Sequence, residues 1–133
     1  MHHFLDPATL LTASLLWKSG QYDQPSRITL LAEAPAVARG QEEFLSWVGS
    51  IRFSPDQIQR LGALQGSDGY SLFDESFLNY LQRFSFQCEV VAVAEGTSVF
   101  PGEPLVRISG PAIQVQMMQP ALIGLIGGAI MKD

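Results

Sequence analysis

Apolar residues recur at helical spacing through much of the first two thirds of the chain, and each such stretch has recognisable start and stop signals. The first predicted helix starts after Asp6, which can cap it, and has Pro7 where a missing N–H costs nothing. Gly20 is a typical stop, and Lys18 lies near the negative end of the helix dipole. We interpret this helix as a packing element; the alternative is a substrate-facing surface.

Three further helices are predicted between residues 40 and 85. The first runs from about 40 to 49, and the second starts at Ser54, which with Gln57 forms a capping-box pattern. The third begins after Asp74, because aspartate favours the position before a helix. The spacing of apolar residues in the first of these helices predicts one buried face, made of Phe44, Leu45 and Val48.

Strand-forming residues are concentrated in the second half of the chain, with one earlier segment. β-Branched and aliphatic residues predict strands at 27–31, 89–94, 98–100 and 105–109, bounded by glycine and proline turns. The expected order is helix, strand, three helices, a compact group of strands and a final helix. This order indicates an α+β fold with antiparallel strands.

The final predicted helix spans about residues 113–131 and is almost free of charge. Its run from Met117 to Met131 is shorter than the ~20 residues that a bilayer-spanning helix needs, and Pro120 and three glycines dilute it. We therefore expect no membrane span. We interpret the segment as a helix built to be buried against a partner.

Composition narrows the class of protein further. With 47% apolar and 16% charged residues among 133, the chain can build one domain with a core, which excludes disorder as its main state. The net charge is -5 and the eight basic residues are dispersed, which argues against nucleic acid or an anionic membrane as a partner. Cys88 is the only cysteine, which fits a reducing, cytoplasmic setting.

Residues suited to catalysis are scarce. The only histidines, His2 and His3, stand near the N-terminus, which argues against a His-based triad or a multi-His metal site. The glycine-rich loop at 62–69 lacks the Gly-Lys-Ser/Thr of a phosphate loop. A biotin or lipoate carrier needs a lysine at a hairpin tip, and none lies between Lys18 and Lys132. We predict no catalytic, substrate-binding or metal-binding residue in this chain.

An ordered set of short segments runs through the chain. It comprises Trp17-Lys18-Ser19-Gly20, Asp23-Gln24-Pro25, Arg52-Phe53-Ser54, Leu72-Phe73-Asp74-Glu75-Ser76-Phe77-Leu78-Asn79-Tyr80-Leu81, Phe84-Ser85-Phe86, Glu95-Gly96-Thr97, Val99-Phe100-Pro101, Glu103-Pro104-Leu105 and Gly110-Pro111. In order and spacing, this set resembles the N-terminal domain of the nicotinate phosphoribosyltransferase family, over roughly residues 5 to 126.

The resemblance implies an α/β-hammerhead-like fold of the nicotinate/quinolinate phosphoribosyltransferase type, which in the family packs against a catalytic barrel. It also implies the reaction of the whole enzyme. Nicotinate and phosphoribosyl pyrophosphate give nicotinate mononucleotide and pyrophosphate, coupled to ATP hydrolysis, in NAD salvage. The groups that handle ATP, Mg²⁺ and phosphoribosyl pyrophosphate belong to the barrel, so we expect this chain to bind no cofactor.

Segments that face the substrate in the family are altered here. The family's first helix carries an Asp-x-Tyr-x-x-Thr-Met motif, whose tyrosine lies against the nicotinate ring across a subunit interface. Asp6 matches this motif, but Ala8 occupies the tyrosine position and cannot stack on a pyridine ring. Leu11 and Thr12 replace Thr-Met. Two other altered segments are the glycine-rich stretch after the first strand, shortened to residues 33–37, and the run at the start of the barrel, now residues 127–130.

We expect residues 1–133 to form a single nicotinate phosphoribosyltransferase N-terminal-like domain, without the catalytic barrel. On this hypothesis the chain alone is inactive and serves as an interaction or accessory subunit. Its partner, or a second copy of the chain, would bind through the C-terminal apolar helix. The alternative is one part of a split or truncated enzyme that is active with a separate barrel chain.

Overall fold

The structure is a computed structural model that describes residues 3–132, the side chain of His3 excepted. The mixed helix-and-strand fold predicted from the sequence is confirmed. Its elements, in chain order, are η1 (His3–Leu5), α1 (Pro7–Ser19), β1 (Pro25–Leu31), β2 (Ala36–Val37), α2 (Gln41–Gly49), α3 (Pro55–Gly62), α4 (Glu75–Gln82), β3 (Glu89–Ala92), β4 (Ser98–Val99), β5 (Pro104–Pro111), α5 (Ala112–Leu125) and β6 (Ala129–Lys132).

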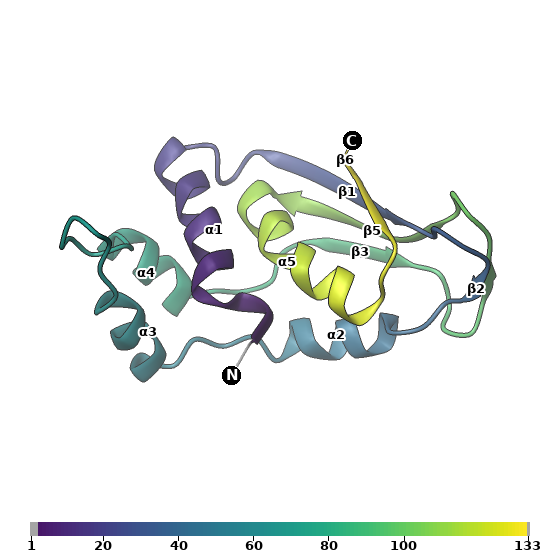
Figure 1. Cartoon of the computed structure of the whole chain (residues 1–133), viewed down its shortest axis with the longest axis horizontal. Coiled ribbons are helices and arrows are strands. Elements are labelled where there is room, and N and C mark those ends of the chain that lie inside the picture. The colour runs from purple at the N-terminus through teal and green to yellow at the C-terminus, as the bar shows by residue number, and fades with distance from the viewer. Residues whose placement is uncertain (1–2, 133) are drawn as a thin grey trace.

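β1 lies inside a four-stranded antiparallel sheet with the order β3-β5-β1-β6 (Figure 1). Ile28 lies opposite Ile108, and Leu30 lies opposite Val106, so four aliphatic side chains occupy one face of the two central strands. α5 packs across this face. The short strands β2 and β4 form a second sheet at one end of the molecule.

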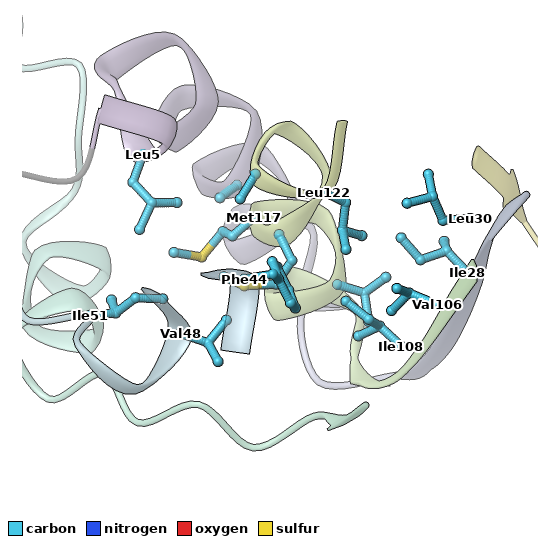
Figure 2. Packing of buried hydrophobic residues seen from close by; sticks show 14 of the residues in the cluster. Leu5, Ile28, Leu30, Phe44, Val48, Ile51, Val106, Ile108, Met117 and Leu122 are labelled. Carbon is cyan, nitrogen blue, oxygen red and sulfur yellow. The ribbon is translucent and has the colours of Figure 1, made fainter. Parts of the chain in front are cut away.

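The main core lies between α5 and this face of the sheet, and it extends to α1 and α2. Figure 2 shows Met117 and Leu122 of α5 lying among side chains from both sides, including Phe44 and Val48 of α2. Met117, Leu122 and Phe44 are each at most 1% exposed. The helix and the sheet therefore exclude water from one another along the length of α5.

Both predicted ends of α1 are confirmed. Asp6 precedes the helix and its Oδ1 accepts the Thr9 N–H at 2.8 Å. Gly20 ends the helix in the left-handed region with φ +79°, where a residue without Cβ is favoured, and its N–H donates to the Trp17 carbonyl. The capping box of α3 is also confirmed, because Ser54 and Gln57 exchange side-chain and backbone hydrogen bonds.

Two details of the other helices differ from prediction. Leu45 was predicted to be buried but is 46% exposed. Gln41 is buried instead, and its Nε2 donates to the Val93 carbonyl. Residues 41, 44 and 48 define the buried face of α2, and Leu45 lies about 100° away from Phe44 around the helix. Asp74 precedes α4 as predicted but makes no side-chain capping bond; its carboxylate lies 3.9 Å from the Lys18 ammonium.

The C-terminal segment corrects the prediction of a helix over about 113–131. α5 ends at Leu125, and Gly127 and Gly128, both with φ +90°, reverse the chain into β6. Residues 129–132 then pair with β1, where Ile130 lies opposite Leu30. The periodicity of a short apolar run does not distinguish a helix from a strand. Here two consecutive glycines form a turn, which separates the end of the helix from a strand.

The expected binding of a partner through the C-terminal helix is not confirmed. Seven residues of α5 are buried, so the helix finds its apolar partners in the sheet, α1 and α2 of the same chain. Within residues 3–132, no helix is both long and apolar enough to cross a bilayer.

Candidate functional site

Ala8, which the resemblance described above places at the family's tyrosine position, lies exposed in the first turn of α1. Its methyl group offers no hydrogen bond and no ring. The neighbouring helix N-terminus is already occupied, because the Asp6 carboxylate accepts the Thr9 N–H. Hydrogen bonds from the Thr9 and Ala8 backbone hold the pKa of Asp6 below its ordinary value of 3.8. An external carboxylate would therefore have to compete with Asp6 for these donors.

Ala8 belongs to a row of exposed residues along α1. Residues at spacings of three and four lie on one face of a helix, and this face comprises Ala8, Leu11, Thr12 and Leu15, here called the outer stripe. Leu11 is 36% exposed and Leu15 is 61% exposed. The outer stripe thus contains all three positions at which α1 departs from the family motif.

The opposite face of α1 is used inside the molecule. Leu10, Ala13 and Ser14 are buried there, and Trp17 packs on Tyr22 and Tyr80 with ring centroids 4.3 and 5.1 Å apart. α1 is therefore apolar on both sides, but only one side is covered. A helix that is apolar all round is normally buried all round.

The other two altered segments, residues 33–37 and 127–130, lie close together. They contribute to one open cavity of about 390 Å³ between the end of β1, the β2–β4 pair and the turn after α5. Glu33 and Arg39 are the charged residues of its lining. The outer stripe of α1 does not contribute to this cavity. The three altered segments of the sequence therefore form two separate surfaces.

A buried polar centre lies between α4, α5 and β3. The Gln114 Oε1 accepts the Gln87 N–H at 2.8 Å, and its Nε2 donates to the Ser85 carbonyl at 2.9 Å and the Tyr80 hydroxyl at 3.4 Å. Cys88 lies beside it, and burial raises the pKa of this thiol to about 11. A thiol with that pKa is protonated at neutral pH and is a poor nucleophile. This centre is structural in character.

Glu95 has a role that the sequence analysis did not identify. Its carboxylate accepts the N–H groups of Gly40 and Glu42 at 3.2 and 3.4 Å, so it caps α2 from a distant turn. The side chain thereby fixes the turn before β4 against the helix. A negative group near a helix N-terminus is stabilising, but no local sequence pattern could reveal a cap supplied from so far along the chain.

Metal-binding and catalytic groupings can be assessed for residues 3–132 except the His3 side chain. Among them, no group of three or more His, Cys, Asp or Glu side chains is arranged to hold a metal ion. His2 lies outside the described residues.

The chain matches a known protein family over most of its length. A family profile described as nicotinate phosphoribosyltransferase N-terminal domain matches residues 12–127. The chain belongs to this family, and what it contains is the family's N-terminal domain.

Relatives in several organisms are similar at low identity. Nicotinate phosphoribosyltransferase 2 of Arabidopsis thaliana is 29% identical over 121 residues, and the Homo sapiens nicotinate phosphoribosyltransferase is 26% identical over 120 residues. Each alignment covers 85% of this chain, and respectively 21% and 22% of the relative. The chain therefore spans about a fifth of the length of the relatives that it matches.

The fold is shared with a solved structure. The crystal structure of human nicotinic acid phosphoribosyltransferase superposes with a TM-score of 0.79 and 25% sequence identity. The match covers 91% of this chain and 25% of the human one. The expectation of the family's N-terminal domain fold is thus confirmed across most of the chain.

Proposed function

We propose that this chain is non-catalytic by itself and acts as an accessory domain that binds another polypeptide through the outer stripe of α1. The observation that carries the proposal is the uncovered apolar face of α1, where Leu11 and Leu15 are exposed beside Ala8. Burying exposed apolar area of this kind stabilises a complex by roughly 25 cal/mol per Å² before the entropy of association is subtracted.

A split enzyme is the second candidate. It is favoured by the retention of the family fold over 91% of the chain. The relatives are named nicotinate phosphoribosyltransferases, and this domain corresponds to about a fifth of their length. On this proposal, a separate barrel chain supplies the phosphoribosyl transfer, and this chain supplies the N-terminal domain.

The two candidates share a first experiment. The purified chain is mixed with the barrel portion of a family enzyme, expressed as a separate polypeptide, and binding is measured by co-purification and analytical ultracentrifugation. We expect binding by the wild-type chain and its loss in Leu15→Glu, which places a charge on the outer stripe. Leu45→Glu, at a side chain that is 46% exposed on α2, is the matched control. Equal binding by both variants would disprove the role of the outer stripe.

Activity then separates the candidates. Nicotinate mononucleotide formation is measured with nicotinate, phosphoribosyl pyrophosphate, ATP and Mg²⁺, for each chain alone and for the complex. The accessory-domain proposal predicts no product from this chain alone and no gain in the complex. Product formation by the complex only would establish the split enzyme. Turnover by this chain alone, in a preparation free of host enzyme, would contradict both.

Ala8→Tyr provides a finer test of the split enzyme. A tyrosine in the outer stripe adds a ring that can stack on nicotinate, worth roughly 0.5–1.5 kcal/mol, or about tenfold in affinity at most. The split-enzyme proposal predicts a lower KM for nicotinate in the reconstituted complex. The accessory-domain proposal predicts no change, and Ala8→Leu controls for added bulk without a phenol.

A further inference from the structure

α3 is an amphipathic helix whose apolar side is incompletely covered. None of its residues is buried, although Ile58 and Leu61 are apolar and the helix has a well-formed capping box. One side of the helix packs toward α4, where a Cβ at Gly62 would touch a Leu78 methyl group at 3.3 Å. The other side carries residues 57, 60, 61 and 64, whose spacing places them on one face.

This second side borders a cavity of about 210 Å³ between α3 and the start of α1. Leu5, Pro7 and Leu10 line it from the N-terminal side, Phe53 lines it from the segment before α3, and Leu61 and Leu64 complete the apolar lining. Leu5, Leu10 and Phe53 belong to the buried core, whereas Leu64 is 36% exposed and marks the open side. The cavity is therefore an extension of the core that the chain's own side chains leave unfilled.

The polar part of the lining consists of Gln57 and Arg60. The Gln57 Oε1 is engaged by the Ser54 N–H at 2.8 Å in the capping box. Arg60 is exposed, and within residues 3–132 no carboxylate lies at salt-bridge distance from its guanidinium. An apolar cavity whose lining includes an arginine that has no salt bridge within residues 3–132 matches a molecule with an apolar body and a single negative group.

We propose that this cavity is a binding site for a small aliphatic monocarboxylate, whose chain enters between α1 and α3 and whose carboxylate pairs with Arg60. The cavity of about 210 Å³ opens at Leu64, so an apolar chain can enter it from solvent. A medium-length saturated chain offers apolar surface to this lining, and a shorter acid tests whether that length is needed. The site is distinct from the outer stripe of α1, and its ligand does not depend on the proposed function.

The experiment uses the whole chain and octanoate, with binding measured by isothermal titration calorimetry. Octanol and octylammonium test the need for a negative group, and butyrate tests the need for chain length. We expect octanoate to bind at least about tenfold more tightly than each of these three. Equal binding of octanoate and octanol, or no binding of octanoate, would overturn the proposal.

Variants locate the site. Arg60→Gln removes the cation from an exposed position, and we expect about tenfold weaker octanoate binding with octanol binding unchanged. Leu64→Glu and Leu64→Gln have similar size, so a loss confined to the glutamate variant would report repulsion of the bound carboxylate. Arg83→Gln, an exposed cation at the end of α4, is the control that should leave binding unchanged. Octanoate binding that is unaffected by both Arg60→Gln and Leu64→Glu would place the ligand elsewhere and refute the site.

Discussion

The two long sides of this small domain are packed to different degrees. Around α5, seven helix residues are buried, and the sheet residues Ile28, Leu30, Val106 and Ile108 are at most 2% exposed. Between α3 and α1, no residue of α3 is buried and a cavity of about 210 Å³ is left open. Both regions are built from apolar residues at correct spacing. The difference shows that the apolar pattern determines which face of an element turns inward. Whether side chains fill the space behind that face depends on how well their volumes and shapes match.

The strongest test of this contrast removes a ring from the packed side. Phe44 is 1% exposed and lies against α5 in Figure 2. We expect Phe44→Ala to lower the free energy of unfolding by about 3–5 kcal/mol, because it removes buried apolar surface and leaves a cavity. Urea denaturation followed by circular dichroism measures the change. A loss below about 1 kcal/mol would mean that this region is less tightly packed than described.

A smaller effect is expected at the buried polar centre. Gln114→Met keeps the side-chain length but leaves the Gln87 N–H and the Ser85 carbonyl without their partner. We expect a loss of about 1–3 kcal/mol, the cost of burying unsatisfied polar groups. Gln116→Met, at a half-buried position with no comparable bonds, is the matched control. Similar losses in the two variants would argue against a specific role for the hydrogen bonds of Gln114.

The third prediction concerns the contribution of the Asp6 cap to stability, at the start of α1 and beside the open region. Removing the cap in Asp6→Ala should cost about 1 kcal/mol near neutral pH. Because the folded-state pKa of Asp6 is lowered, its stabilisation is complete above the unfolded-state value, near 3.8, and is lost as the pH falls through the folded-state value. The stability difference between wild type and variant should therefore shrink below about pH 4. A difference that stays constant from pH 7 to pH 2 would contradict this linkage.

The smallest effect is expected at the rim of the cavity. Leu64 is already 36% exposed, so Leu64→Ala should change the free energy of unfolding by no more than about 0.5 kcal/mol. The free energies of unfolding lost in Phe44→Ala and in Leu64→Ala together measure how differently the two regions are packed. A loss at Leu64 of about 2 kcal/mol would show that the cavity closes in solution.

Local signals predicted the elements of the fold more successfully than their ends and contacts. Asp6, Gly20 and the Ser54–Gln57 pair act within a few residues of themselves, so the sequence alone identifies them. β6 was missed because its strand character depends on pairing with β1, a partner about a hundred positions earlier in the chain. The helix predicted over 113–131 was too long for the same reason, because the sequence does not show that residues 129–132 pair with β1.

For the surfaces, too, local sequence signals were predictable and tertiary contacts were not. Ala8 could be singled out from its resemblance to a family motif, and the structure places it on an exposed face. The cavity beside Arg60 could not be foreseen, because its lining comes from three segments that only tertiary packing brings together. In the sequence Leu10, Leu11 and Leu15 are equivalent apolar residues, and only burial in the structure distinguishes Leu10 from the other two.

The position of β1 has a consequence for synthesis of the protein. This strand is made early, yet both of its neighbours in the sheet, β5 and β6, begin only at Pro104 and Ala129. At roughly 5–20 residues per second, a ribosome exposes β1 for several seconds before either edge can be paired. During that interval the strand offers unpaired amides and carbonyls along two sides, a state prone to wrong association. The nascent chain is therefore expected to depend on chaperones until β5 and β6 have emerged, although the domain is small.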